Sequence, residues 1–552
     1  MPTTWFTTAI LAFLNTPIGS YCLSQHIFHL LPEAVLLITL GLGFWMASGS
    51  SSKTTGSFDV WRLSFWGLAI ALILAIGDYF LTFTDRSTGS LLPYTVNVPV
   101  LWDMIRVDLL FTLSRLVLLF GTLLVVLFSR TFIQQSSPTS GEFPLILIAA
   151  TLGATLMAGA NDLIMMFVAL ETLGISSFIL SGYFRDDAKS AEASLKYLLY
   201  GGAATAFILF GMSLLYGLSG GFTHFQLVAY GLTKLSHATF QPVMVIASVL
   251  LLVGFAFKLS AAPFHQWAPD VYDGSPAPVT AFLSVISKIG AFALLLRVLT
   301  LFLVALAPTM KGLGGVPASV LTGLFGLMAV GSMVVGNLAA LRQHNVKRLM
   351  AYSTIAHVGY LLLALVVLDK SAYAAAFFYL ITYLFMNLGA FACVVWFTQE
   401  TGREDIQAYA GLIQKKPLLA IALSIFLLSL AGIPITSGFF AKFFLFQAVF
   451  KANPATLGLI VVALLTSTIS LYYYLNLIRL MVIAEPSDAV TRLGRFQWNT
   501  AAPCLVVIGL CCWVTLLLGI QAQPTLNLAN TALNQLGQAS QQPNIMLLSA
   551  GH

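Results

Sequence analysis

The sequence predicts an all-α polytopic membrane protein with about fourteen transmembrane helices. Hydrophobic residues make up 59% of the 552 residues and charged residues only 8%, and the mean hydropathy is +0.91. A chain of this composition cannot hide its apolar surface in water-soluble domains of ordinary size. Its apolar runs are about 20 residues long and continuous, whereas barrel strands would alternate apolar and polar residues. The runs therefore predict helices.

Each predicted span is one such run, rich in Leu, Ala, Phe and Ile. In chain order the spans are 31–50, 63–84, 109–130, 143–160, 162–183, 194–217, 242–265, 278–302, 317–339, 347–368, 372–398, 417–448, 456–482 and 501–520. The spans lie in a membrane domain that we expect to cover residues 31–520.

The two ends of the chain are expected to lie outside this domain. Residues 1–30 hold a short apolar run from Trp5 to Leu14 without a basic segment before it, which indicates an interfacial or re-entrant extension and not a cleaved signal peptide. Residues 521–552 contain no Lys, Arg, Asp or Glu and are rich in Asn and Gln. We expect a loosely ordered polar tail there.

Basic residues predict the orientation of the chain in the membrane. Loops after odd-numbered helices hold fourteen Lys or Arg, namely Lys53, Arg62, Arg130, Arg185, Lys189, Arg342, Lys347, Arg348, Arg403, Lys415, Lys416, Arg479, Arg492 and Arg495. The other loops hold six, namely Arg86, Arg106, Lys234, Lys311, Lys370 and Lys451. Because basic loops stay in the cytoplasm, both termini are expected on the non-cytoplasmic side. These loops and the lysines within spans account for the net charge of +6. The sequence therefore gives no sign of a basic surface that binds nucleic acid.

The sequence offers no sign of a resident cofactor. Cys22, Cys393, Cys504, Cys511 and Cys512 show no CxxC spacing, so a metal or iron–sulfur site is not expected. Neither a dinucleotide-binding GxGxxG nor a P-loop GxxxxGK[ST] is present. Any energy that drives this protein is expected to come from a partner or an ion gradient.

Five ionisable residues lie inside predicted spans: Glu171, Lys196, Lys258, Lys288 and Lys442. A charge at the bilayer centre costs at least about 2.5 to 3.5 kcal/mol, so such residues need a polar interior and usually have a function. They predict an ion path. Moving a counter-charge from about 4 to about 8 Å at an effective dielectric of about 20 changes the attraction by about 2 kcal/mol, so lysine can load and release protons there. Sodium fits poorly, because a hard cation prefers several oxygen ligands.

Two prolines predict breaks in the seventh and twelfth helices. Pro263 leaves the carbonyl of Leu259 without its usual donor, and Pro434 does the same to Leu430. Exposed backbone at membrane depth is tolerated only where protein or water satisfies it. The breaks lie five helices apart, which predicts two inverted five-helix repeats at about 143–302 and 317–482.

Five motifs carry a resemblance to a known family. They are ALETLGISSFILSGY at 169–183, EASLKYLLYGG at 192–202, FKLSAAPFHQWAPDVYDGSPAP at 257–278, NVKRLMAYSTIAHVGY at 345–360 and LAGIPITSGFFAKFFLF at 430–446. In this order they resemble the antiporter-like subunits of respiratory complex I over about residues 145–480. HQWAPDVYDGSP is more similar to subunit N, called subunit 2 in cyanobacteria and chloroplasts, than to subunits M and L or the Mrp antiporters.

The resemblance implies that the five ionisable residues are proton-path positions. From the chemistry of buried lysines, our candidates are Glu171 with Lys196 for the switch, Lys258 for the central carrier, Lys288 for the relay and Lys442 for the exit side. The resemblance further implies that NADH, NADPH or ferredoxin, FMN, iron–sulfur clusters and quinone are used by other subunits. The expected partners are the membrane and hydrophilic subunits of complex I, in the cell inner (plasma) membrane or, as an alternative, a thylakoid membrane.

Several of these charged residues also have a purely structural interpretation. Glu192 lies one turn before Lys196 and could form a static ion pair with it. Lys442 and, more readily, Arg297 could extend to the membrane interface. Glu33 and Asp78 lie near helix ends and are expected to be interfacial. Arg115, inside the third span, has no sequence-based explanation.

The histidines and aromatic residues near the motifs also leave two interpretations open. His265 follows Pro263 and could relay protons or bond a freed carbonyl. His357 lies one turn past Ser353, where a water-mediated relay and a structural histidine are equally expected. Trp267, Tyr352 and Tyr360 are expected to be interfacial anchors.

Three functions remain from the sequence. The favoured one is a proton-translocating subunit of NADH-quinone oxidoreductase that carries no redox site of its own. The second is a stand-alone or Mrp-like cation/proton antiporter, which would exchange ions without partners. The third is an enzyme with its own quinone site, for which the sequence offers no flavin, haem or metal ligands.

Overall fold

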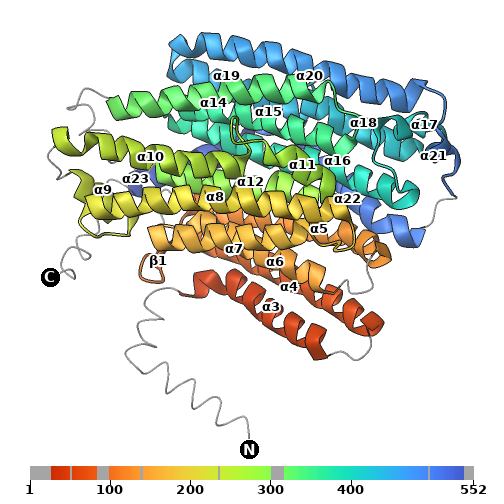
Figure 1. Cartoon of the computed structure of the whole chain (residues 1–552), viewed down its shortest axis with the longest axis horizontal. Coiled ribbons are helices and arrows are strands. Elements are labelled where there is room, and N and C mark those ends of the chain that lie inside the picture. Colours follow the sequence, from red (N-terminus) through yellow and green to blue (C-terminus); the bar gives the residue numbers. More distant parts are fainter. Residues whose placement is uncertain are drawn as a thin grey trace, which may run out of the picture.

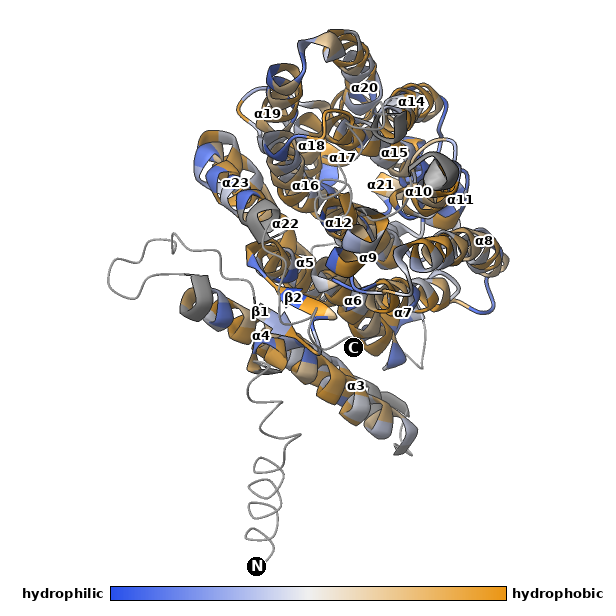
Figure 2. Ribbon diagram, turned by 90° about the vertical axis from the view of Figure 1, so that its left-hand side faces the viewer, coloured by the Kyte–Doolittle hydropathy of each residue, from blue (hydrophilic) through white to orange (hydrophobic). Residues whose placement is uncertain are grey.

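The computed structural model describes residues 27–49, 53–83, 98–136, 141–233, 237–299, 316–494 and 498–539. Long helices packed side by side form the bundle, and α3 and α4 lie together at one edge of it (Figures 1 and 2). Orange, hydrophobic segments extend along the helices in Figure 2. The Trp5 to Leu14 run falls outside the described residues.

The first half of the chain forms the elements up to the first break and the helix after it. They are η1 (Ile27–Leu30), α3 (Leu31–Gly49), α4 (Lys53–Phe83), β1 (Val98–Val100), β2 (Ile105–Val107), α5 (Leu109–Ser136), α6 (Glu142–Gly159), α7 (Leu163–Ser181), α8 (Ala188–Ser219), α9 (Phe225–Thr233), α10 (His237–Leu259), α11 (Trp267–Gly274) and α12 (Ala277–Val298). The antiparallel pair β1 and β2 places Val98 opposite Val107.

The second half follows the same all-helical pattern. Its elements are α14 (Val316–Ala340), α15 (Val346–Val366), α16 (Lys370–Thr401), η3 (Ile406–Tyr409), α17 (Leu412–Lys415), α18 (Pro417–Ala431), α19 (Ser437–Ala452), η4 (Pro454–Thr456), α20 (Leu457–Ile483), α21 (Asp488–Thr491), α22 (Trp498–Ile520) and α23 (Ala522–Ala539).

The prediction of about fourteen spans is confirmed. In the described ranges, 13 helices are long and apolar enough to cross a membrane. The remaining predicted span, 417–448, consists of α18 and α19, which are separated by the residues around Pro434. Each of these two is too short to cross alone, but together they supply the fourteenth span.

Both predicted breaks are also confirmed. The seventh span ends as α10 at Leu259, and the chain resumes helical structure in α11 only at Trp267. The twelfth span stops at Ala431 and resumes at Ser437. The two inverted repeats at 143–302 and 317–482 stay a prediction.

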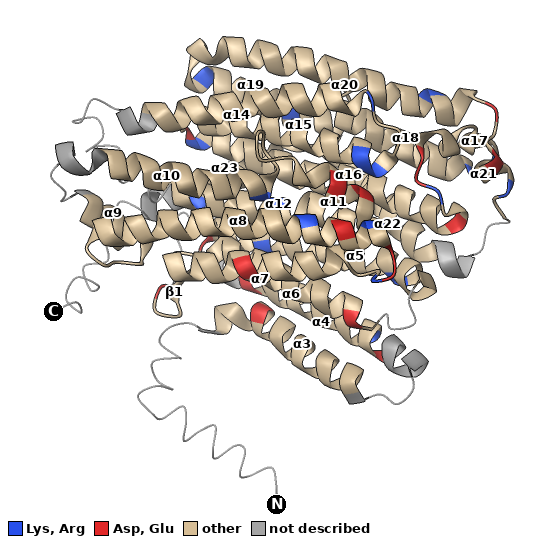
Figure 3. Ribbon diagram, viewed as in Figure 1, with Lys and Arg blue, Asp and Glu red and all other residues tan. Residues whose placement is uncertain are grey.

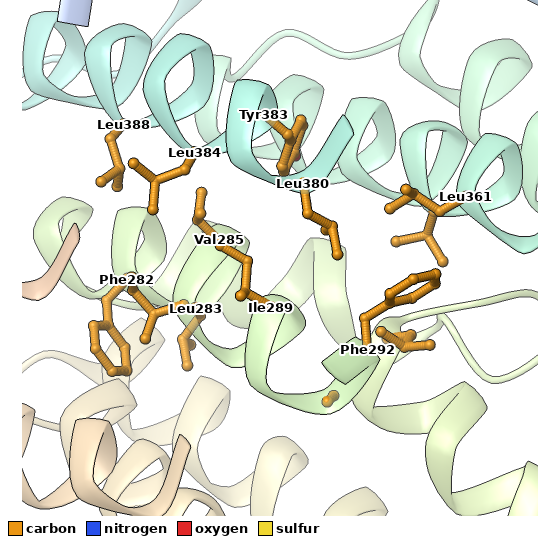
Figure 4. Packing of buried hydrophobic residues seen from close by; sticks show 14 of the residues in the cluster. Phe282, Leu283, Val285, Ile289, Phe292, Leu361, Leu380, Tyr383, Leu384 and Leu388 are labelled. Carbon is orange, nitrogen blue, oxygen red and sulfur yellow. The ribbon is translucent and has the colours of Figure 1, made fainter. Parts of the chain in front are cut away.

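Helix α12 forms the centre of the bundle. Every residue from Ala277 to Val298 is buried, and α12 packs against α16. Figure 4 shows Val285 and Ile289 of α12 facing Leu384 and Leu380 of α16. Since α12 is surrounded by protein along its whole length, the charged Lys288 on it must be satisfied by protein groups.

Close packing of α14 on α15 depends on two glycines. A Cβ at Gly336 would lie 2.6 Å from the backbone nitrogen of Ala356, and one at Gly359 would lie 2.7 Å from the Met333 side chain. Small residues allow membrane helices to approach this closely. The position of α15 is thereby fixed.

The expectation of a loosely ordered tail is wrong for residues 522–539. They form α23, which packs on α16 and α5. Ala529, Ala532 and Leu533 are buried. The Asn and Gln content suggested disorder, but apolar residues at three- and four-residue spacing give this helix one face that can be buried.

Candidate functional site

The first helix break holds Lys288. Ser260 follows the end of α10 with a φ of 62°, a left-handed conformation that is uncommon for residues other than glycine. Lys288 Nζ donates to the carbonyl of Leu259 at 3.3 Å and to Ser260 Oγ at 3.0 Å. The carbonyl that Pro263 was predicted to leave without a donor is therefore bonded by the lysine on α12.

The second break holds Lys442 in a similar way. Its Nζ donates to the carbonyls of Leu430 at 3.1 Å and Ala431 at 2.9 Å, and to Ser467 Oγ at 2.8 Å. Ile435, next to Pro434, has a φ of 80°, which is a marked outlier for a β-branched residue. Strained backbone of this kind is often found at functional sites. Lys442 is only 6% exposed, so its predicted alternative, extension to the interface, is wrong.

Lys258 is close enough to both Glu171 and Lys288 to interact with their charges. It is buried on α10, and Glu171 on α7 and Lys288 on α12 both interact with it electrostatically. Its Nζ lies 3.8 Å from the position that a Cβ at Gly174 would take. Glu171 also accepts a hydrogen bond from Thr205 Oγ1 at 2.7 Å. Three of the five predicted residues are thus brought together.

Lys196 pairs with two carboxylates. Its Nζ pairs with Glu192 Oε1 at 2.7 Å and with Asp270 Oδ2 at 2.6 Å. Among the described ion pairs, its partners are these two carboxylates and not Glu171. Among the described ion pairs, the one found is the structural alternative, in which Lys196 pairs with Glu192 one helical turn away, and the switch between Glu171 and Lys196 stays a prediction. Asp270 reaches Lys196 from α11, which packs on α8. Figure 3 shows acidic and basic positions within the bundle as well as at its ends.

The two histidines have different surroundings. His357 is buried and bonds Tyr379 Oη through Nδ1 at 2.6 Å, whereas Ser353 bonds Tyr474 Oη. This favours the structural interpretation of His357, although Lys442 interacts with it electrostatically. His265 is half-buried beside Pro263 and lines a groove of about 510 Å³ between α10 and α14.

Arg115 is explained by the carboxylates that were expected at the interface. Its guanidinium donates to Glu33 Oε2 at 3.4 Å, to Asp78 Oδ2 and to the carbonyl of His29. Glu33 is 4% exposed, and His29 Nδ1 lies 2.6 Å from Asp78 Oδ1. The interfacial interpretation of Glu33 and Asp78 is therefore wrong, because both turn inward to compensate the charge of Arg115.

Arg297 is likewise not an interfacial residue. It is fully buried and donates from Nη1 and Nη2 to Asp108 at 2.8 and 2.9 Å, with Nε bonded to the carbonyl of Ala158 at 3.0 Å. This two-pronged geometry is the strongest form of an ion pair. It fastens the end of α12 to the start of α5 and the end of α6.

Two of the three aromatic residues expected at the interface are in the core. Trp267 and Tyr360 are each 1% exposed, and their rings lie 5.8 Å from Lys288 Nζ and 5.3 Å from Lys442 Nζ respectively. The expectation was wrong because each lies beside a break within the bundle. Ser260, Ser467 and Asp270 were missed, although Ser260 and Asp270 lie inside the quoted 257–278 motif.

Comparisons with known proteins agree with this geometry. Residues 160–470 match the family described as "NADH:quinone oxidoreductase/Mrp antiporter, TM". The fold and the buried lysines at helix breaks therefore belong to the class of antiporter-like membrane proteins.

Similar proteins narrow this class. The chain is 45% identical to NAD(P)H-quinone oxidoreductase subunit 2 of Thermosynechococcus vestitus, over 76% of this chain and 79% of that protein. It is 41% identical to the organellar chromatophore protein of the same name from Paulinella chromatophora, over 91% and 93%. This chain therefore belongs to the subunit 2 family of the NAD(P)H-quinone oxidoreductases.

Solved structures support the assignment. A chain of respiratory complex I from Thermus thermophilus with bound aureothin is 31% identical, with a TM-score of 0.70 over 91% of this chain and all of that one. A chain of the Mrp complex from Dietzia has a TM-score of 0.76 over 92% of this chain and 98% of that one, at 22% identity. The second likeness concerns the fold alone.

Proposed function

We propose that this chain translocates protons as the antiporter-like membrane subunit of an NAD(P)H-quinone oxidoreductase. The observation that carries the proposal is the pair of buried ammonium groups at the two helix breaks. Lys288 and Lys442 each bond a backbone carbonyl at a break. A lysine in such a site can hold or give up a proton while its neighbours stay in place, because the carbonyl and hydroxyl ligands carry no charge.

The proposed path begins with Glu171, Lys258 and Lys288. A protonated Lys258 is stabilised by Glu171 and opposed by a protonated Lys288, because like charges repel in a medium of low dielectric. Loading one lysine therefore favours release from the other. Driving one proton against about 150 mV costs about 3.5 kcal/mol, which a few coupled shifts of about 2 kcal/mol can supply.

In this proposal Lys442 delivers the proton toward the exit side. It interacts electrostatically with His357, and Ser467 and Tyr360 lie around its ammonium group. Sodium is not expected to bind at these breaks, since a charged ammonium group would repel it and already occupies the carbonyl and hydroxyl oxygens that a hard cation prefers.

Redox chemistry is proposed to take place on other subunits. NAD(P)H or ferredoxin would be oxidised there through FMN and iron–sulfur clusters, and quinone would be reduced at a separate site. Within the described residues, no group of three or more His, Cys, Asp or Glu could hold a metal ion. The relatives include cyanobacterial proteins, so the host membrane would be a plasma or thylakoid membrane, with both termini on the non-cytoplasmic side.

Purification and reconstitution test this function against a free-standing antiporter. A tag on the chain in native membranes should recover hydrophilic iron–sulfur subunits, and vesicles of the complex should acidify when NAD(P)H or ferredoxin reduces quinone. The chain alone should catalyse neither quinone reduction nor cation/proton exchange. Exchange by the chain alone, without recovery of partner subunits, would support the antiporter and contradict the proposal.

A further inference from the structure

We propose that the short helix α11 couples the two halves of the proton path, with Asp270 as a positioning residue that holds Lys196 of α8 and Arg348 of α15 together. The inference rests on the proposed function. It adds a named coupling element between the lysines of the first and second breaks. Helix α11 contacts both α8 and α15 (Figure 1).

The N-terminal end of α11 contacts Lys288, which belongs to the first half of the path. Trp267, its first residue, lies 5.8 Å from Lys288 Nζ in a cation–π arrangement and donates from Nε1 to the carbonyl of Phe257 at 3.0 Å. Its ring stacks on Tyr197 of α8 with centroids 4.4 Å apart and planes 6° apart. Because a cation–π contact exists only for the charged lysine, the proton on Lys288 affects how α11 is held.

One turn further, Asp270 joins two cations from different helices. Its Oδ2 lies 2.6 Å from Lys196 Nζ, and its Oδ1 lies 2.8 Å from Arg348 Nη1. Asp273 adds a weaker contact to Arg348 at 3.7 Å. Each oxygen of Asp270 thus serves one half of the molecule.

Lys196 has a second acceptor on its own helix. Glu192 Oε1 lies 2.7 Å from its Nζ, so the ammonium group can leave Asp270 without becoming unpaired. The side chains of Lys196 and Asp270 are 36% and 35% exposed, and ion pairs with this exposure exchange partners at low cost. In this structure Lys196 bridges both carboxylates and so ties α8 to α11; in the proposal, it releases α11 when it keeps Glu192 alone.

Helix α15 carries the effect to the second break. Arg348 lies in its first turn and Tyr360 lies twelve residues later, about 18 Å along the same helix. The Tyr360 ring lies 5.3 Å from Lys442 Nζ. Lys347, beside Arg348, donates to the carbonyl of Ser275, directly after α11, at 2.9 Å. Movement of α11 relative to α8 thus acts on the helix that packs against Lys442.

The test is the Asp270→Asn variant of the full complex in vesicles. We expect assembly to be retained, NAD(P)H-quinone turnover to fall about fivefold, and the number of protons moved per electron to decrease. Asp270→Glu should restore both. Asp405→Asn is the matched control, since it removes an exposed carboxylate that pairs with Arg403 at 3.3 Å, and it should behave as wild type.

A double-mutant cycle separates coupling from simple loss of structure. If Lys196 and Arg348 act through Asp270, Lys196→Gln and Arg348→Gln should each lower the proton yield, and their combination should cost no more than the larger single effect. If the Asp270→Asn complex fails to assemble, the Lys196 and Arg348 variants still test whether the two residues are coupled. Additive losses, or a normal proton yield in an assembled Asp270→Asn complex, would overturn the inference. If Lys258→Ala loses pumping while Asp270→Asn pumps normally, the inference fails but the proposed function stands.

Discussion

Removing the charge of Asp108 should destabilise the chain strongly, because it leaves Arg297 buried without a counter-ion. The side chains of Arg297 and Asp108 are 0% and 4% exposed, so water cannot replace the lost carboxylate. Breaking a buried pair in this way costs about 3 to 5 kcal/mol. With an unfolding entropy of about 2.1 cal/mol/K per residue, this corresponds to roughly 3 to 4 °C in the midpoint of thermal unfolding for a chain of 552 residues.

Asp108→Asn isolates the charge, because an amide oxygen can still accept the hydrogen bond from the backbone nitrogen of Phe111, which is 2.8 Å from Asp108 Oδ1. The assay is the midpoint of thermal unfolding of this subunit in the purified complex. The double variant with Arg297→Met removes both charges and should recover at least half of the loss, since most of the cost of breaking a buried pair comes from the charge that is left without a partner. A single-variant midpoint within about 1 °C of wild type, or a double variant as unstable as the single one, would refute the reasoning.

Two further predictions concern charge. Glu171→Gln keeps the volume but removes the counter-charge of Lys258, so electron transfer coupled to pumping should slow by about fivefold or more; an unaltered turnover rate would assign Glu171 a structural role. Burial by itself would raise the pKa of Asp103, but hydrogen bonds from His224 and Arg106 hold the pKa below its ordinary value. Because the unfolded value is about 3.9, this stabilisation of the β1–β2 hairpin is fully present above about pH 4 and is lost as the pH falls through the lower native value. Hydrogen exchange of residues 98–108 should show faster opening in acid, and Asp103→Asn should show it already at pH 7; equal protection of both proteins at pH 7 would contradict this.

Hydropathy and proline position predicted the membrane helices and their two breaks, because both are local properties of the chain. A span needs only its own apolar length, and Pro263 and Pro434 disrupt helical bonding within four residues of themselves. The same local rule identified Leu259 and Leu430 as the residues whose carbonyls lose their helical donor, and these carbonyls accept from the lysines. The rule could not identify which lysine would bond Leu259, since Lys288 is 29 residues away along the chain.

The pairing of charges could not be predicted for the same reason. Arg115 meets Glu33 and Asp78, which are 82 and 37 residues away, and no spacing in the sequence links them. The general rule that a buried charge needs a partner was available. Applied to Arg115 and Arg297, it would have favoured inward-facing carboxylates over interfacial ones. Asp270 lies in a short amphipathic helix, and a carboxylate there could have indicated a cationic partner, but no local spacing points to Lys196 or Arg348.

The central claim is that protons pass through Lys258 to the lysines at the breaks, and proton yield per electron in the Lys258→Ala complex tests it most directly. The measurement uses sealed vesicles of the assembled complex, with quinone reduction and acidification followed together. The account predicts a complex of normal composition in which the proton contribution of this subunit is nearly abolished. A wild-type proton-to-electron ratio in the assembled variant would contradict it.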